Sequence, residues 1–456
     1  MDFFDRQDEI RRLRAALSAA PPVLVVIYGR RRCGKSSIMR RVVGPRDVYF
    51  LASQNDSALQ RAALASEISR VVRGFDEAVY PSWDALLRSL AERTARRVSL
   101  FIDEFPYLVQ TSSELPSVLQ GFLEGTGAAR VNLVLCGSSQ RMMHGLVLDR
   151  TAPLYGRARE ILKVRPLAAG WIREALELAG DKAVEAYAVW GGVPRYWELA
   201  RDYRSLEAAV EALVLDRNGV LHEEPLRLLL DDMRTAGQAH SLLSLIASGC
   251  HRLSEIAGRM EKPAGMLTRT LANLIDLGYV RRECSFGENP RTTRRTLYKL
   301  NDPFMQFHFR FVQAHQSMLE LGLTRAVGTA VKEALSSHVA GVWEAMARES
   351  VPFIRIGDIQ WGAASRWWGA GTDGKMLGLD VVAESMDRTA LLVGEAKWTA
   401  SRVDVGRVVA GLKDCVKRLP VVRGHRVVLA LWAKEKVQSP VDVRVLTPDD
   451  VLGSLK

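Results

Sequence analysis

Short apolar runs separated by helical segments organise the first third of the chain. Residues 23–27, 98–102 and 131–136 are rich in Val, Ile and Leu, and each run ends at polar or glycine residues. Runs of five or six such residues are typical of buried strands, and their alternation with helices indicates an α/β fold. The pattern therefore predicts an α/β domain over residues 1–165.

The hydrophobic pattern changes after residue 165 and divides the rest of the chain into four segments. A helix-rich stretch predicts a lid, and two apolar strands at 377–383 and 391–398 predict a second α/β domain. Three helices with a hairpin, followed by a helical linker, lie between these two segments. The predicted boundaries are 166–237 for the lid, 238–315 for the helices and hairpin, 316–335 for the linker and 336–456 for the last domain.

The segment 238–315 has the pattern of a winged helix-turn-helix. Its third helix carries a buried leucine stripe at helical spacing, and its two β-rich runs flank a loop of turn-forming residues. The expected elements are a helix at 241–247, a helix at 254–259 capped by Ser254, a third helix around 267–275, and strands at 279–283 and 295–300.

Composition and charge narrow the class of protein. The chain has 456 residues, 48% hydrophobic and 25% charged, which suits a globular protein of about three domains. Its formal net charge of +11 favours an anionic partner, and nucleic acid, in particular double-stranded DNA, is the leading candidate. No apolar run approaches the roughly 18 residues that span a bilayer. We therefore expect a cytoplasmic protein that does not bind membranes. The chain has five cysteines, at positions 33, 136, 250, 284 and 415. None of them has CxxC spacing, so they indicate neither a disulfide framework nor a zinc site.

A glycine-bracketed loop follows the first apolar run and leads into a helix. A strand, such a loop and a helix N-terminus in that order surround a phosphate with backbone N–H groups, and the helix dipole favours the negative charge. The pattern predicts a P-loop for ATP, with Lys35 at the β- and γ-phosphates and Ser36 on Mg²⁺. The expected nucleotide contacts here are Gly29, Arg30, Arg31, Arg32, Cys33, Gly34, Lys35, Ser36 and Ser37.

The second apolar run ends in Asp103-Glu104, the pattern of a Walker B strand. We expect Asp103 to hold Mg²⁺ and Glu104 to orient or deprotonate the attacking water, unless the pair is an ordinary acidic helix start. Ser139, after the third run, either senses the γ-phosphate or belongs to a turn. Arg157 and Arg195 lie beside glycines, and each either contacts the γ-phosphate, in cis or from a neighbouring subunit, or lies at the surface. Hydrolysis as well as binding of ATP is expected.

Basic residues gather in the predicted winged helix-turn-helix. Residues 252–299 contain ten basic and five acidic side chains, a net charge of +5. Arginines around a wing suit contacts with DNA phosphates. The alternative is a winged helix that contacts protein or serves as a rigid spacer. The candidate nucleic-acid contacts are Arg269, Arg281, Arg282, Arg291, Arg294 and Arg295.

A second set of chemical residues lies in the last domain. Asp380 belongs to its first predicted strand, while Glu395 and Lys397 share one face of the second. Paired carboxylates suit Mg²⁺ and a lysine can position water, which is the chemistry of metal-dependent phosphodiester cleavage. Glu344, on an upstream helix, either completes the metal site or faces solvent. The alternative for the whole set is an ordinary polar face on a small sheet.

These motifs together resemble the archaeal-type P-loop ATPases of the AAA-like class that carry a winged helix and a C-terminal restriction-endonuclease-like, PD-(D/E)XK, domain. The resemblance covers nearly the whole chain and implies an ATPase of the additional-strand-catalytic-glutamate type, with its nucleotide site at Lys35, Ser36, Asp103 and Glu104. Such ATPases often form rings, so a homo-oligomer is one possible state of this protein. Besides the residues named above, the resemblance rests on Phe4-Asp5-Arg6, Phe105, Cys136-Gly137-Ser138-Ser139, Tyr155-Gly156-Arg157, Gly191-Gly192-Val193-Pro194, Asp302-Pro303-Phe304 and Trp398.

Two functions are consistent with these residues. The first is an ATP-hydrolysing DNA-binding protein with a Mg²⁺-dependent nuclease domain gated by nucleotide state. The second is a nucleotide-controlled regulatory or scaffold switch with an inactive nuclease fold. Gly378 favours the second, because members of the resembling type often carry Glu two residues before the first nuclease aspartate.

Overall fold

The computed structural model describes residues 3–125, 130–233, 235–293, 295–399, 403–422, 424–436 and 443–456. The chain splits into two compact units. We call Asp5–Pro166 with Asp231–Arg234 the N-terminal unit, and Leu167–Leu230 with Thr235–Lys456, to which the residues up to Phe4 also belong, the C-terminal unit. None of the described helices is long and apolar enough to cross a membrane, and the five cysteines are free.

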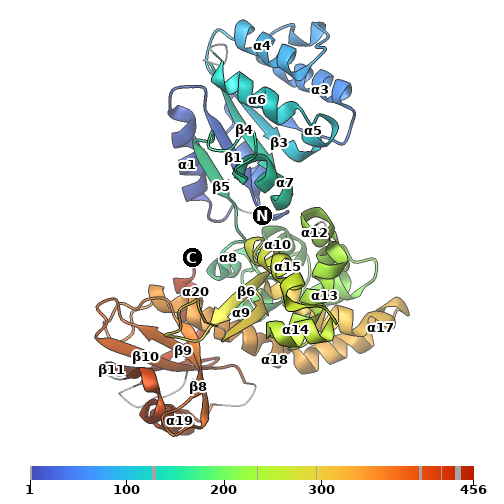
Figure 1. Cartoon of the computed structure of the whole chain (residues 1–456). Helices are drawn as coiled ribbons and strands as arrows, with labels where there is room; N and C mark the ends of the chain where they lie inside the picture. The colour runs from blue at the N-terminus through green and yellow to red at the C-terminus, as the bar shows by residue number, and fades with distance from the viewer. Residues whose placement is uncertain are drawn as a thin grey trace. The chain divides into compact units, whose positions relative to one another are not determined.

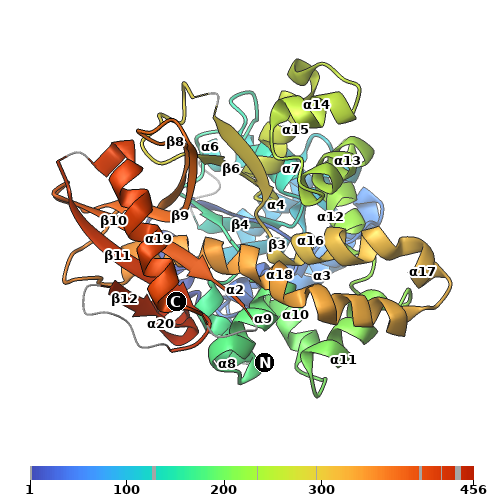
Figure 2. The ribbon, with the colours of Figure 1, turned by 90° about the horizontal axis from the view of Figure 1, so that it is seen from below.

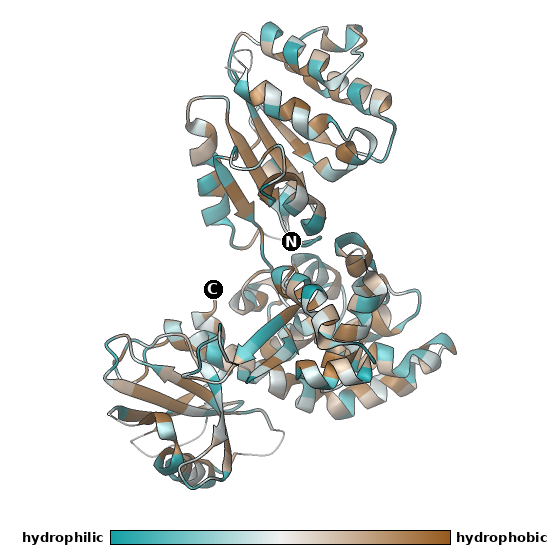
Figure 3. Cartoon of the chain, in the orientation of Figure 1, coloured by the Kyte–Doolittle hydropathy of each residue, from teal (hydrophilic) through white to brown (hydrophobic). Residues whose placement is uncertain are grey.

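A five-stranded parallel sheet forms the centre of the N-terminal unit (Figure 1). Its strands are β1 (Leu24–Tyr28), β2 (Val48–Leu51), β3 (Val98–Asp103), β4 (Val131–Gly137) and β5 (Glu160–Lys163). Their order is β2-β3-β4-β1-β5, so β4 lies between the strand before the glycine loop and the strand that ends at Asp103. The inner strands β3 and β4 are buried along their lengths and largely brown in Figure 3, because the centre of a parallel sheet is covered on both faces. The predicted α/β fold of this part of the chain is confirmed, and its sheet is parallel.

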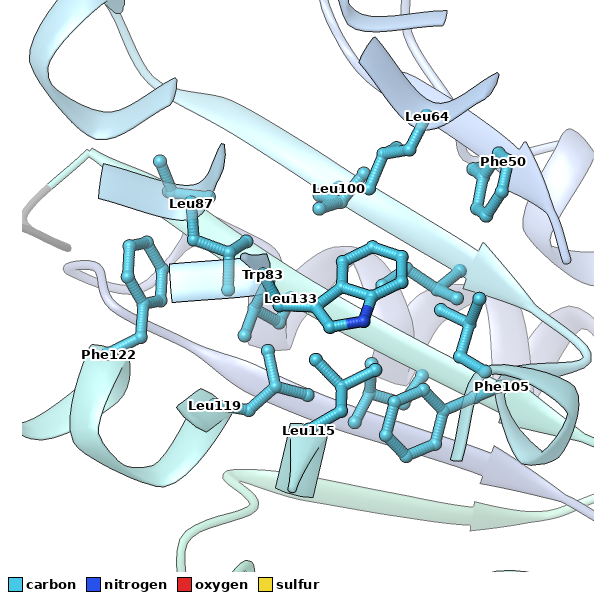
Figure 4. Close-up of a cluster of buried hydrophobic side chains, with 14 of the residues drawn as sticks. Phe50, Leu64, Trp83, Leu87, Leu100, Phe105, Leu115, Leu119, Phe122 and Leu133 are labelled. Carbon is cyan, nitrogen blue, oxygen red and sulfur yellow. The ribbon is translucent and has the colours of Figure 1, made fainter. Parts of the chain in front are cut away.

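In the described part of the N-terminal unit, seven α-helices surround this sheet. They are α1 (Gln7–Ser18), α2 (Lys35–Arg40), α3 (Ser57–Ser69), α4 (Trp83–Arg93), α5 (Phe105–Thr111), α6 (Leu115–Glu124) and α7 (Gln140–Met143). A core cluster of the unit joins α3, α4 and α6 to the strands, and Figure 4 shows Trp83 within it, beside Leu100, Leu115 and Leu133. This packing fixes the strand ends from which the loops with polar residues emerge.

Helices make up most of the first half of the C-terminal unit. They are α8 (Ile172–Leu176), α9 (Gly180–Trp190), α10 (Pro194–Ala200), α11 (Leu206–Val210), α12 (Glu224–Asp232), α16 (Pro303–Phe307), α17 (Gln316–Glu320) and α18 (Thr324–Ser350). The last two residues of α12 belong to the N-terminal unit by their contacts. The α12 helix therefore connects the two units along the chain.

Three helices and a two-stranded antiparallel hairpin form residues 236–300, which we call the helix–hairpin module. Its elements are α13 (Ala236–Ala247), α14 (Leu253–Arg259), α15 (Ala264–Asp276), β6 (Val280–Cys284) and β7 (Thr296–Leu300). The α14 helix begins one residue earlier than expected, and Ser254 is not its cap. The reason is that the Glu255 carboxylate accepts a hydrogen bond from the backbone N–H of Arg252 at 3.1 Å.

A second five-stranded sheet ends the C-terminal unit. Its elements are β8 (Ser365–Ala370), β9 (Met376–Glu384), β10 (Ala390–Lys397), α19 (Val405–Arg418), β11 (Arg426–Ala433), β12 (Val443–Leu446) and α20 (Pro448–Ser454). The order is β12-β11-β10-β9-β8, antiparallel from β8 to β10 and parallel from β10 to β12. Figure 2 shows α19 lying over these strands, where it packs on a cluster that includes Leu431. The next side chain, Trp432, donates to Ser350 at the end of α18, so α18 and α19 cover opposite faces.

Candidate functional sites

The glycine loop connects β1 to α2 and has the backbone of a phosphate-binding turn. Three of its residues have positive φ: Gly29 at 149°, Arg32 at 67° and Gly34 at 91°. A Cβ at Gly29 would lie 2.2 Å from the carbonyl oxygen of Val164, so only glycine fits there. The structure places all nine predicted contact residues, 29–37, in this loop and the first turn of α2.

The side chain of Lys35 lies inside the loop. It is only 6% exposed, and its Nζ donates hydrogen bonds to the carbonyl oxygens of Gly29 and Arg30, both at 3.0 Å. The ammonium group is thus held across the loop by neutral acceptors, which anionic phosphate oxygens can replace with stronger bonds. Ser36 follows directly, half-buried in the first turn of α2.

Asp103 lies at the end of β3 and is almost fully buried. Its Oδ2 accepts a hydrogen bond from the Tyr49 hydroxyl at 2.7 Å, and its Oδ1 accepts one from the backbone N–H of Glu104 at 3.0 Å. Burial and the Asp103 carboxylate raise the pKa of Tyr49 to about 12, so the hydroxyl keeps its proton and donates. The sequence analysis did not identify Tyr49. Tyr49 lies on β2 and Asp103 on β3, and the sequence alone does not show that these two strands are neighbours.

Glu104 has positive φ and points back toward β4. Its Oε2 accepts two hydrogen bonds from Ser138, one from the backbone N–H at 3.2 Å and one from the hydroxyl at 2.8 Å. Among the described residues Oε1 has no hydrogen-bond partner, so one carboxylate oxygen is fixed and the other is available to a water. Ser138 therefore orients Glu104. The sequence analysis named the neighbouring Ser139 instead. Which of the two serine side chains points toward Glu104 could not be determined without the structure.

Ser139 contacts the last turn of α12. Its hydroxyl donates to the carbonyl oxygen of Asp231 at 3.0 Å, and the backbone N–H of Gln140 donates to the carboxylate of Asp232 at 3.0 Å. The Asp231 carboxylate pairs with Arg31 of the glycine loop at 3.0 Å. Asp231 and Asp232 thus contact both the glycine loop and the residues that follow β4. The sequence did not predict this arrangement, because these segments are far apart along the chain.

The two arginines proposed as γ-phosphate contacts have other partners in this structure. Arg157 donates to Glu124 with Nε at 2.9 Å and to the carbonyl oxygen of Tyr155 at 3.1 Å. Arg195 lies at the start of α10 in the C-terminal unit, exposed and paired with Glu198 at 2.9 Å. Both have surface ion pairs, which contribute little stability and break readily.

The candidate nucleic-acid arginines of the helix–hairpin module divide by their contacts. Arg281 is inward-facing and pairs with Glu283 at 2.8 Å. Arg269, Arg282, Arg291 and Arg295 are exposed, and Arg295 pairs weakly with Glu288 at 3.5 Å. Arg294 lies outside the described residues.

Three carboxylates of the last sheet domain are close enough to influence one another. Burial first, and then the charge of Asp380, raise the pKa of both Glu344 and Glu395. Lys397 Nζ pairs with Glu395 at 2.6 Å, and Arg366 pairs with Glu344 at 3.8 Å. The structure therefore brings together the four residues that the sequence placed on α18, β9 and β10.

A bulge aims Asp380 toward this cluster. Ser365 pairs with Val382 but Trp367 pairs with Leu379, so Asp380 and the next residue together face Arg366 alone. Bulges redirect side chains and often lie near functional sites. The Asp380 carboxylate accepts a hydrogen bond from the backbone N–H of Ala396 on β10 at 3.2 Å, which connects the two carboxylate-bearing strands.

Arg348 joins the carboxylate cluster to the hairpin. Its guanidinium donates to the carbonyl oxygen of Asp380 at 3.0 Å and lies 3.7 Å from Glu283 on β6. Glu283 is also paired with Arg281 and with Lys299, the latter at 3.7 Å. The hairpin loop is fixed as well, since the Ser285 hydroxyl donates to the carbonyl oxygen of Trp368 at 3.1 Å. Hairpin and sheet thus form one connected structure, which the sequence did not reveal.

The donors present suit a hard cation such as Mg²⁺. At the glycine loop these are the hydroxyl of Ser36 and the carboxylate of Asp103. In the last domain, no three described His, Cys, Asp or Glu side chains are placed to hold one metal ion. Mg²⁺ is commonly bound by one or two carboxylates together with substrate phosphates, so Asp380 and Glu395 have the chemistry that it requires.

Comparison with known proteins identifies the N-terminal part. Residues 3–199 match a family described as an ATPase domain predominantly from Archaea, and residues 308–408 match one described as archaeal and bacterial proteins of unknown function. An uncharacterized protein of Methanocaldococcus jannaschii is 27% identical over 415 residues, 87% of either chain.

A solved structure gives a likeness of fold alone. It is the Walker-type ATPase of Pyrococcus abyssi, with a TM-score of 0.51 and 21% identity over 68% of this chain and 96% of that one. Residues 3–199 thus match an archaeal-type ATPase domain, and this match supports nucleotide hydrolysis as the class of activity. The nuclease-like domain stays a prediction.

Proposed function

We propose that the ATPase domain controls a nucleic-acid-processing protein. ATP is hydrolysed at the glycine loop, DNA binds at the helix–hairpin module, and the carboxylate cluster of the last domain cleaves phosphodiester bonds. The observation that carries the proposal beyond an ATPase is the meeting of Glu344, Asp380, Glu395 and Lys397 beside the arginine-rich hairpin.

The residues of the glycine loop have the positions that ATP hydrolysis needs. Lys35 exchanges its two loop carbonyls for phosphate oxygens and compensates their charge. Asp103 and Ser36 would hold Mg²⁺, which supplies charge neutralisation when bound. Glu104, fixed through Oε2, accepts the proton of the attacking water at Oε1. Ser138 acts through Glu104 as a positioning residue.

Nucleotide state reaches the rest of the chain through Asp231 and Asp232. These residues contact Arg31 of the glycine loop, Ser139 and Gln140, and they are the last two residues of α12. A phosphate group in the loop competes with Asp231 for Arg31. We infer that this exchange releases or holds the end of α12, so that the nucleotide gates DNA engagement by the C-terminal unit.

Phosphodiester cleavage is assigned to the last domain. Asp380 and Glu395 would hold Mg²⁺, whose role is to polarise the phosphate and activate water. Lys397 lies beside Glu395 and is available to position the water or to steady the charge of the phosphorane. Arg366, 3.8 Å from Glu344, is the cationic partner of the third carboxylate.

A regulatory switch is the second candidate, and one observation favours it. Each outer carboxylate of the cluster already has a cationic partner, Lys397 for Glu395 and Arg366 for Glu344. Such pairs compete with a metal ion for the same oxygens. Together with Gly378, this arrangement suits a nuclease fold that has lost cleavage and serves as a scaffold.

The deciding experiment compares plasmid and linear DNA cleavage by wild type, Asp380→Asn and Lys35→Ala, with Mg²⁺ or Mn²⁺ and with or without ATP. Asp387→Asn is the matched control, since Asp387 is an exposed turn carboxylate of the same domain that bonds only Ser385 and Thr389. Nicking lost in Asp380→Asn but kept in Asp387→Asn supports the nuclease, and its loss in Lys35→Ala supports gating. ATP hydrolysis without any cleavage supports the switch instead.

A further inference from the structure

A cavity of about 690 Å³ opens in the N-terminal unit where α3 and α4 end and β3 begins. Val98, the first residue of β3, lines it, whereas the glycine loop follows the last residue of β1. These strands belong to one parallel sheet. The cavity therefore lies where the strands begin, and the glycine loop lies where they end. Six of the described lining residues are arginines, and none is acidic: Arg46, Arg70, Arg73, Arg93, Arg96 and Arg97.

All six arginine side chains are exposed, and five of them form no ion pair with a carboxylate in the described part of the chain. Arg70 pairs with Glu67 at 2.8 Å, while Arg93 and Arg97 donate only to backbone carbonyl oxygens, those of Arg73 and Ser18. Like charges gathered without counterions repel one another and destabilise the folded unit. The side chains of Arg46, Arg73 and Arg96 have no ion-pair or hydrogen-bond partner in the part of the chain that the structure describes.

A buried hydroxyl in the same wall is a second, independent sign of a ligand. Thr94 follows α4, is only 3% exposed and lines the cavity. Its Oγ1 has no hydrogen-bond partner among the described residues, whereas its backbone N–H donates to Leu90 and its carbonyl oxygen accepts from Arg130. Buried hydroxyls are normally paired, so an unpaired one beside a cationic cavity points to a missing acceptor.

We propose that this cavity binds consecutive phosphates of a nucleic-acid strand, with the Thr94 hydroxyl donating to one phosphate oxygen. Guanidinium groups bind phosphate through parallel N–H bonds, and six of them exceed what a single phosphate requires. The rest of the lining includes Val71, Val72 and Val98, which offer no side-chain donor or acceptor to base edges. Binding here is therefore independent of base sequence.

This site does not depend on the proposed role of the hairpin. The hairpin arginines belong to the C-terminal unit and the cavity arginines to the N-terminal unit. Variants can be made in either set alone, so failure of one proposal is distinguishable from failure of the other.

The first test measures binding of labelled single-stranded and duplex oligonucleotides by fluorescence anisotropy at several salt concentrations. The cavity variant is Arg46→Gln/Arg73→Gln/Arg96→Gln, which removes only arginines without described partners. We expect affinity at 0.1 M salt to fall about tenfold or more, and the slope of log K against log salt to fall by about 2 to 3, since each phosphate contact contributes about 0.7 to 0.9.

The matched control is Arg11→Gln/Arg12→Gln/Arg88→Gln. It removes the same charge from the same unit, but these arginines are paired with Asp8, Glu160 and Asp84 and lie outside the cavity lining. An equal loss in both triple variants would overturn the proposal, because binding would then follow total charge. Loss only in Arg282→Gln/Arg291→Gln would overturn it too, while leaving the hairpin proposal intact. No binding by wild type would remove both.

Thr94→Val gives a test in which stability and binding change in opposite directions. Removing an unpaired buried hydroxyl raises or preserves the melting temperature, while loss of a phosphate donor weakens oligonucleotide binding about three- to tenfold. A lowered melting temperature with unchanged binding would refute the assignment of Thr94. Competition with inorganic tripolyphosphate and with poly-glutamate separates phosphate from carboxylate recognition. Preferential competition by poly-glutamate would identify an acidic protein segment as the occupant and overturn the proposal.

Discussion

Replacing Glu283 with Gln should loosen the connection between the hairpin and the last sheet domain. Glu283 is surrounded by three cations, Arg281 at 2.8 Å and Lys299 and Arg348 at 3.7 Å. Burial alone raises the pKa of its carboxyl group, but the three cations outweigh this effect and lower the pKa to about 2. The substitution keeps the volume of the side chain and removes its charge, so the three cations remain without their counterion.

The size of the effect follows from the shift in pKa. A fall from 4.5 to about 2 corresponds to about 3 kcal/mol of stabilisation by the ionised form, at about 1.4 kcal/mol per unit. Because the folded-state pKa is depressed, this stabilisation is fully present above pH 4.5. It is lost as the pH falls from 4.5 toward 2. The difference between wild type and variant should therefore be constant from pH 8 to 5 and shrink only below that range.

Hydrogen exchange of the β6 and β7 amides measures this local stability. About 3 kcal/mol corresponds to exchange roughly a hundredfold faster in Glu283→Gln at neutral pH. Glu288→Gln is the control, since Glu288 lies in the same hairpin but pairs at 3.5 Å with an Arg295 whose side chain is 66% exposed. An effect of Glu283→Gln no larger than that of the control, or one that is equally large at pH 3, would refute the reasoning.

Three further predictions concern the two chemical sites. Lys35→Ala should reduce ATP hydrolysis at least a hundredfold through lost charge compensation at the phosphates, measured as phosphate release, while circular dichroism stays unchanged. Tyr49→Phe should lower the free energy of unfolding of the N-terminal unit by about 1.5 to 3 kcal/mol, the worth of a hydrogen bond to a buried charged group, here Asp103; a melting curve equal to that of wild type would count against this bond. Asp380→Asn should abolish Mn²⁺ binding to the last domain. Burial and the charge of Asp380 raise the pKa of Glu395, so in wild type Mn²⁺ binding should weaken at a higher pH than it would at an ordinary carboxylate. Titration calorimetry between pH 5 and 8 measures the Mn²⁺ affinity.

The sequence led furthest where the signal is local. The strand, glycine turn and helix around Gly29–Ser37 come in an order that backbone geometry demands of a phosphate loop, and the structure has β1, the loop and α2 in that order. The strand runs at 98–102 and 131–136 correspond to β3 and β4 within a residue at their ends. Hydrophobic periodicity and turn chemistry act over a few residues, and a single chain displays them directly.

Partners distant in the sequence were decided by the tertiary structure alone. Tyr49 is 54 positions from Asp103, and Ser139 is 92 positions from Asp231, yet each pair shares a hydrogen bond. Arg348 reaches Asp380 only because α18 packs against the second sheet.

The sequence by itself thus determined the strand and helix types, the glycine loop and the ATPase class. Strand order, the direction of each polar side chain and the approach of Arg46, Arg70 and Arg73 to the arginines that flank Thr94 were decided only by the tertiary structure. The physical reason is that local propensities depend on neighbours in the chain, whereas hydrogen bonds, ion pairs and shared cavities depend on which distant segments the packed core brings together.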